Sequence, residues 1–163
     1  MGTDLWVANA SPLIFLGKAG LYGLLLRSAP SIVIPIAVRD EIVAGPGGAE
    51  LLEGLKNDAR VRFCPNVAVS PGLLTWDLGS GETQVIAMAS DMPGAHVVLD
   101  DLQARRCARA GGLKIIGTLG IVGRAKRTGI IGSAKPVIER LRQAGMYASD
   151  ALVMQILKEV GEC

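Results

Sequence analysis

The chain has 163 residues, of which 50% are hydrophobic, 20% are charged and only 4% are aromatic. This composition is too apolar for a disordered chain, and the length predicts a single domain over residues 1–163 with an aliphatic core. The net charge of +2 hides an asymmetry, because residues 100–145 hold ten bases and three acids, whereas the remainder holds seven bases and twelve acids. Such a basic segment fits polyanion binding and ordinary solvated helix faces equally well.

The apolar segments and the cysteines indicate the cellular compartment of the protein. No basic leader precedes the first apolar run, and the apolar stretch Leu13–Leu26 is interrupted by Gly17, Lys18 and Gly20. We therefore expect neither a signal peptide nor a transmembrane span, which needs about 20 mostly apolar residues. The three cysteines lack metal-ligand spacing and are interpreted as reduced thiols, so a cytoplasmic protein without membrane contact is expected.

Short apolar strands alternate with helices along the chain. The expected strands cover residues 5–8, 31–34, 61–63, 96–99 and 114–116. The expected helices begin near Pro12 and then cover residues 35–43, 49–57, 82–90, 102–110, 118–127, 134–144 and 149–160, with a loop around Pro65, Pro71 and Gly72. This alternation predicts an α/β fold with a parallel sheet covered by helices on both faces. In such sheets the functional crevice lies beyond the carboxyl ends of the strands.

Oxygen-bearing side chains occur where this crevice is expected. Asn9 follows the first strand, Glu41 lies in the helix after the second, Glu82 begins the helix after a Gly-rich turn, and Asp100 and Asp101 follow the strand 96–99. Clustered carboxylates are costly to bury unless a cation lies between them. Mg²⁺ or Mn²⁺ suits such an oxygen-rich set, and beside a phosphodiester it would polarise the phosphate and lower the pKa of a bound water.

Each of these acids also has a structural interpretation. Glu82 has capping-box spacing and would be stabilised by the positive end of its helix, and Glu41 fits a plain helix surface. Asp100 is a candidate N-cap of the following helix. One cap needs one acid, however, and the second acid of the pair Asp100-Asp101 is then unexplained. The spacing alone leaves both interpretations open.

Six segments, in order along nearly the whole chain, resemble a branch of the PIN-domain family. They are Asn9–Ile14, Val38–Ile42, Gly79–Ala87, Val97–Arg105, Ile116–Ile121 and Leu141–Asp150. Each segment is a weak signal, but the ordered set is a strong one. The resemblance implies a three-layer α/β/α fold with a central parallel sheet, and a Mg²⁺- or Mn²⁺-dependent ribonuclease. It further implies a toxin similar to VapC, inhibited by an antitoxin protein that covers the acidic site.

Carried over by position, the resemblance implies roles for individual side chains. Catalytic and metal-binding roles go to Glu41, Glu82 and Asp100, with Asp101 and Asn9 beside them, polar support to Ser11 and Thr118, and RNA contact to Arg105, Arg106 and Arg109. PIN domains usually have Asp at the position of Asn9, although the branch with this opening segment typically has the same Asn. An amide oxygen can bind a cation but brings no charge, so weaker metal affinity is expected.

Three functions are compatible with these features. The first is a metal-dependent endoribonuclease that leaves 5′-phosphate and 3′-hydroxyl ends. The second is a catalytically weak or inactive PIN-like module that binds RNA or an antitoxin, and Asn9 supports it. The third is a phosphohydrolase or nucleotide binder, although the chain lacks a P-loop and the Gly-x-Gly-x-x-Gly motif after its first strand. The apolar positions of the last helix, such as Leu152 and Ile156, fit either a homodimer interface or the core.

Overall fold

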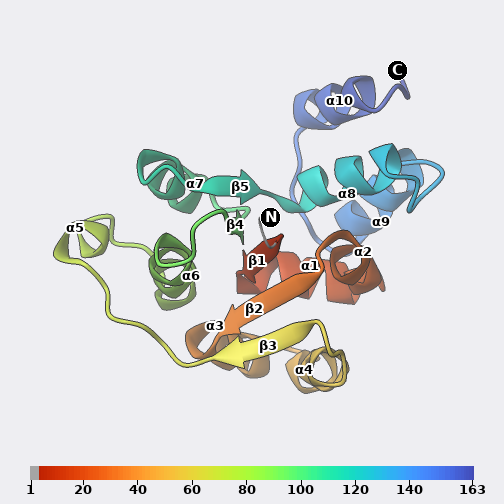
Figure 1. The fold of residues 1–163 in the computed structure, drawn as a ribbon. Helices are drawn as coiled ribbons and strands as arrows, with labels where there is room; N and C mark the ends of the chain where they lie inside the picture. The colour runs from red at the N-terminus through yellow and green to blue at the C-terminus, as the bar shows by residue number, and fades with distance from the viewer. Residues whose placement is uncertain (1–3) are drawn as a thin grey trace.

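The computed structural model describes residues 4–163 and contains a five-stranded parallel sheet (Figure 1). The strands are β1 (Leu5–Ala8), β2 (Ser31–Pro35), β3 (Val61–Cys64), β4 (His96–Val98) and β5 (Lys114–Ile116), in the spatial order β3-β2-β1-β4-β5. The central strand β1 pairs with β2 in the register Val7↔Val33 and with β4 in the register Val7↔Val97. The predicted α/β fold with a parallel central sheet is confirmed.

Helices cover both faces of this sheet, which confirms the three-layer arrangement (Figure 1). One face carries α1 (Ala10–Lys18), α2 (Tyr22–Ser28), α4 (Gly48–Lys56), α8 (Thr118–Arg127) and α9 (Lys135–Gln143), and α10 (Asp150–Glu159) packs on α8. The other face carries α6 (Ser80–Ser90) and α7 (Leu102–Ala110), with the short α5 (Pro71–Leu74) against α6. Helix α3 (Ile36–Ala44) contacts α1, α4 and α6, so it connects the two layers.

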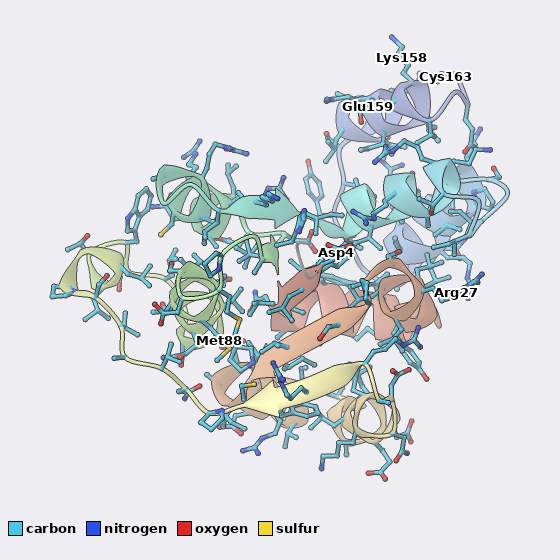
Figure 2. The ribbon with its side chains drawn as sticks, viewed as in Figure 1. Asp4, Arg27, Met88, Lys158, Glu159 and Cys163 are labelled. Carbon is cyan, nitrogen blue, oxygen red and sulfur yellow. The ribbon has the colours of Figure 1, made fainter. Side chains whose placement is uncertain are left out.

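The core between the layers is aliphatic, as the composition predicts. Val7, Ile32 and Ile34 on the strands are fully buried, because a parallel strand between two helical layers contacts helices on each side. Trp6 on β1 is fully buried as well. Met88, which is labelled on α6 in Figure 2, is only 2% exposed. The continuous apolar runs of the sequence therefore mark strands that are covered on both faces.

Three local features differ from the sequence-based expectations. Helix α2 was not predicted, and the chain enters it through Gly20, whose φ of +70° is a left-handed conformation that favours glycine. Helix α1 begins at Ala10, before Pro12, which lies in the first turn where proline has no hydrogen bond to lose. Helix α5 forms in the expected loop because Ser70 caps its N-terminus.

Neither a disulfide nor a helix able to cross a membrane is found in residues 4–163. No helix in this range combines the required length with the required hydropathy. Cys64, Cys107 and Cys163 are free thiols, which agrees with the sequence-based interpretation. Burial raises the pKa of the Cys107 thiol, so this cysteine is a weak nucleophile.

The strand order places the switch point of the sheet between β1 and β4. From β1 the chain moves through β2 to β3, and it then returns to the other side of β1 with β4 and β5. At such a point the connections leave in opposite directions and open a crevice beyond the carboxyl ends of the two strands. Asn9, which follows β1, and the residues Leu99–Asp101, which follow β4, are therefore the first candidates for a site.

Candidate metal centre

Asn9 follows β1 at the switch point, and its buried side-chain oxygen has no hydrogen-bond partner among the described residues. The residue is 3% exposed, and its backbone N–H donates to the carbonyl of Val98 at 3.1 Å, which holds it beside the end of β4. A buried acceptor without a partner costs about 1–3 kcal/mol. A cation bound at Oδ1 would remove this cost, so the orphaned oxygen fits a metal ligand.

Asp100 lies two residues beyond β4 and is held by Thr118, the first residue of α8. The Thr118 backbone N–H donates to Oδ1 at 2.7 Å, and its hydroxyl donates to Oδ2. Thr118 is fully buried, so it orients the carboxylate from a fixed position. Thr118 therefore contacts Asp100, whereas Ser11 is exposed in the first turn of α1, and the support roles expected of both residues stay predictions.

The N-cap of α7 is Asp101 and not Asp100. Oδ2 of Asp101 accepts a hydrogen bond from the Ala104 N–H at 2.9 Å. The structural interpretation of Asp100 as the cap is therefore wrong, because its carboxylate is engaged by Thr118 instead. Asp100, the acid closer to the end of β4, therefore caps no helix.

Glu41 and Glu82 come together at the N-terminus of α6. Glu41 is exposed on α3, and its Oε1 accepts from the Gly81 N–H at 2.8 Å. Oε2 of Glu82 accepts from the Gly79 N–H at 3.1 Å, which is the predicted capping contact. A Cβ on Gly81 would lie 2.7 Å from Oε1 of Glu41, so a side chain there would displace the carboxylate.

The charges of neighbouring acids act on Glu82. Burial raises the pKa of its carboxyl, and the negative charges of Asp101 and Glu41 raise that pKa further, although the hydrogen bond from Gly79 opposes them. Acids from the α3, α6 and α7 segments therefore lie within electrostatic reach of one another. A region in which carboxylates repel each other favours a bound cation.

The acids are spread along the carboxyl edge of the sheet and do not form one compact cluster. Within residues 4–163, no group of three or more Asp, Glu, His or Cys side chains is arranged to hold a metal ion. Glu41 and Glu82 lie at the α6 end, Asp100 lies beside α8, and Asn9 follows the central strand between β2 and β4. The set consists only of hard oxygen donors and includes the orphaned oxygen of Asn9. It therefore fits Mg²⁺ or Mn²⁺.

The three arginines expected to contact RNA lie on α7, directly after these acids. Arg106 and Arg109 are exposed, whereas Arg105 is half-buried. Nη1 of Arg105 donates to the backbone carbonyl of Leu99 at 2.9 Å. The guanidinium groups of Arg106 and Arg109 are thus accessible to a polyanion, whereas that of Arg105 is hydrogen-bonded to the protein backbone.

Two glycines of the site were not singled out in the sequence. Gly81 leaves space for Glu41, and Gly117 leaves space on the other side, where a Cβ would lie 2.7 Å from Nη1 of Arg105 and 3.0 Å from Oδ1 of Asp100. The only signal in the sequence is their position beside the predicted Glu82 and Thr118. Glycine near a helix start is ordinarily explained by a turn, so this signal has little specificity.

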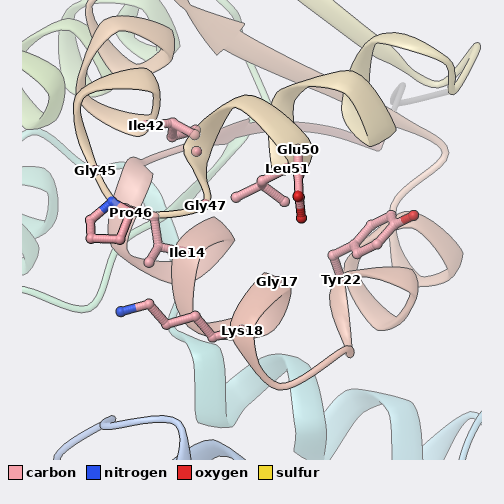
Figure 3. A pocket seen from close by; sticks show the side chains of 11 residues that line it. Ile14, Gly17, Lys18, Tyr22, Ile42, Gly45, Pro46, Gly47, Glu50 and Leu51 are labelled. Carbon is pink, nitrogen blue, oxygen red and sulfur yellow. The ribbon is translucent and has the colours of Figure 1, made fainter.

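A cleft of 460 Å³ lies between α1 and the turn from α3 to α4 (Figure 3). Ile14, Pro46 and Leu51 line it, together with the charged side chains of Lys18 and Glu50. Of the described residues that line it, none is an acid of the candidate metal centre. The cleft is therefore a separate surface feature.

Glu82→Gln is expected to raise the melting temperature at pH 7. The folded state raises the pKa of this carboxyl, so it binds the Glu82 proton more tightly than the unfolded state does. The stability of the wild type therefore falls as pH rises from the unfolded pKa of about 4.3 through the higher folded pKa, whereas glutamine has no charge to bury and still accepts from Gly79. Thermal melts at pH 7 and pH 4 measure the gain, which should be present at pH 7 and small at pH 4.

The matched control is Glu53→Gln on the exposed face of α4, which should leave the melting temperature nearly unchanged at both pH values. A Glu82→Gln variant less stable than the wild type at pH 7 would show that the buried charge is favourable in the folded protein.

Comparison with known families agrees with this fold. A family model described as a PIN domain (DUF3368) matches residues 5–162, which is nearly the whole chain. No curated protein matches the chain significantly. PIN domains are usually nucleases and typically use divalent metal ions. The chain belongs to the PIN-domain family.

Proposed function

We propose that this PIN domain is a metal-dependent endoribonuclease, with Mg²⁺ or Mn²⁺ bound by Asn9, Glu41, Glu82 and Asp100, with Asp101 adjacent. The observation that carries the proposal is the buried Oδ1 of Asn9, which lacks a partner among the described residues at the switch point of the sheet. The nuclease activity usual in the family supports it. An oxygen-only donor set favours a hard divalent cation over a thiophilic metal.

In this proposal, different residues of the chain bind the cation and the RNA. Thr118 orients Asp100, and the Gly79 and Gly81 amides orient Glu82 and Glu41, so the carboxylates are preorganised around the crevice. The exposed Arg106 and Arg109 are placed to contact the RNA backbone. When bound, the cation would polarise the scissile phosphate and lower the pKa of the attacking water. The expected products carry 5′-phosphate and 3′-hydroxyl ends.

A cleavage assay tests this function. Purified protein, free of any co-expressed partner, is incubated with mixed RNA and Mn²⁺, with and without EDTA. We expect cleavage that EDTA abolishes and that Glu82→Gln lowers about tenfold or more, because a ligand has lost its charge. Glu53→Gln should cleave like the wild type. Cleavage that is unchanged by EDTA and by Glu82→Gln would contradict the proposed metal-dependent mechanism.

A second candidate function is a non-catalytic module that binds RNA or an antitoxin. The neutral amide of Asn9 and the spread of the carboxylates favour it. This function predicts no cleavage with any divalent metal, together with RNA binding that weakens as salt rises. The same assay therefore separates the two functions.

The finer biological role in our proposal is that of a cytoplasmic toxin in a toxin–antitoxin pair, built as one domain over residues 1–163. The family match over residues 5–162 supports the domain, and the resemblance to VapC-like toxins supports the role. In this proposal a protein antitoxin covers the acidic site at the carboxyl edge of the sheet, and the cleft beside α1 (Figure 3) is a separate surface. The exposed Leu152 and the half-buried Ile156 lie one turn apart on α10, and this pair supports a homodimer interface.

A further inference from the structure

We propose that Arg105 is a positioning residue for Asp100, and that Gly117 provides the space in which the guanidinium group and the carboxylate lie together. The proposal rests on the proposed metal-dependent function, because it assigns Arg105 to the metal centre and not to the RNA. It is carried by the contacts of three segments: the end of β4, the second turn of α7 and the start of α8.

Arg105 fixes the backbone that leads into Asp100. Its Nη1 donates to the carbonyl of Leu99 at 2.9 Å, while the N–H of Leu99 donates to the carbonyl of Ile116 at 3.1 Å. Leu99 is fully buried, and it is held by α7 on one side and by β5 on the other. The residue that follows it, Asp100, therefore starts from a fixed position.

Gly117 has no conformational reason to be glycine. Its φ of −95° and ψ of 175° are an extended conformation that any residue adopts. A Cβ at this position, however, would lie 2.7 Å from Nη1 of Arg105 and 3.0 Å from Oδ1 of Asp100. The guanidinium group of Arg105 and the carboxylate of Asp100 occupy the space that a side chain at position 117 would fill. Only glycine at this position therefore leaves both groups where they are.

The shape of the Arg105 side chain matters more for this role than its charge. A positive charge beside a cation-binding carboxylate opposes the binding of a divalent cation, so charge alone would make Arg105 unfavourable at this place. The planar guanidinium fork, by contrast, reaches a buried carbonyl while lying against the backbone of Gly117, which the single ammonium group of lysine does not reproduce. Lysine keeps the positive charge, so Arg105→Lys leaves the charge effect in place and tests the positioning role alone.

The test compares Arg105→Lys and Gly117→Ala with the wild-type full chain. Titration calorimetry with Mn²⁺ alone should show about tenfold weaker binding in both variants, the effect usual for residues that orient metal ligands. Arg62→Lys on the exposed side of β3 and Gly132→Ala, where a Cβ meets nothing within 4 Å, are the controls and should bind Mn²⁺ like the wild type. Melting curves confirm that each variant is folded at the assay temperature.

A second readout does not need a metal. Hydrogen exchange of the Thr118 amide, which donates to Asp100, should become roughly five- to tenfold faster in both variants, because the carboxylate that accepts this proton is less well held. The comparison is made without divalent cations. It reports on the position of Asp100 directly.

The possible results distinguish a failure of the positioning role of Arg105 from a failure of the proposed metal-dependent function. Unchanged Mn²⁺ affinity and unchanged Thr118 exchange in Arg105→Lys would overturn the positioning role. Weaker RNA binding in Arg105→Lys, and no change in the other two measurements, would also overturn it and assign Arg105 to RNA contact. A wild-type chain that binds no Mn²⁺ would instead overturn the proposed function, and the exchange rates would then decide the positioning role by themselves.

Discussion

Asp100→Asn is expected to lower the rate of metal-dependent RNA cleavage about 100-fold or more. The variant removes one negative charge from the end of β4 and changes almost nothing else in shape. A charged ligand contributes several kcal/mol to a metal-assisted transition state, and each 1.36 kcal/mol corresponds to a tenfold change in rate. Single-turnover cleavage of RNA at a fixed Mn²⁺ concentration measures the effect.

The fold should survive this substitution, because the contacts of Asp100 can be kept. The Thr118 N–H can donate to the amide oxygen of the new asparagine, and the Thr118 hydroxyl can accept a hydrogen bond from its NH₂ group. Asp91→Asn, an exposed position at the end of α6, is a matched control that should cleave like the wild type. A rate in Asp100→Asn within about twofold of the wild type would remove Asp100 from the site.

The sheet could be predicted because its strands follow a simple physical rule. A strand buried on both faces is a continuous apolar run, and residues 31–34 and 96–99 show this pattern clearly. Helix α2 was not predicted, because residues 22–28 belong to the same apolar stretch as α1 and the interruptions at Gly17, Lys18 and Gly20 do not by themselves mark a second helix. Its existence depends on the left-handed turn at Gly20 and on packing against α8, and the packing is a tertiary contact that the local sequence does not show.

The roles of the individual acids were less predictable than their positions. Local spacing allowed either Asp100 or Asp101 to cap α7, and the choice depends on Thr118, a contact across 18 residues of sequence. The importance of Gly81 and Gly117 depends likewise on carboxylates that reach them from other elements. The ends of the strands thus indicate where a site lies. Tertiary contacts determine which acid caps a helix and which is held for another role.

Asn9→Asp is expected to increase the affinity for Mn²⁺ about tenfold or more and to raise the cleavage rate at limiting Mn²⁺. The substitution places a negative charge where the wild type has a neutral amide oxygen, at a position that is only 3% exposed. Coulombic attraction to a divalent cation is strong where water is excluded, and about 1.4 kcal/mol suffices for a tenfold gain. Titration calorimetry and cleavage assays across a Mn²⁺ series measure both effects.

The same charge should destabilise the metal-free protein, because a buried carboxylate next to other acids has no compensating partner. Mn²⁺ at about 100 times its Kd would restore about 2.7 kcal/mol, since a ligand that binds only the folded state stabilises it by mass action. The melting temperature of Asn9→Asp should therefore rise with Mn²⁺ much more than that of the wild type or of Asn57→Asp, an exposed control at the end of α4. A variant that is destabilised equally with and without Mn²⁺ would mean that the orphaned oxygen of Asn9 does not bind the cation. The non-catalytic module would then be the better account of this chain.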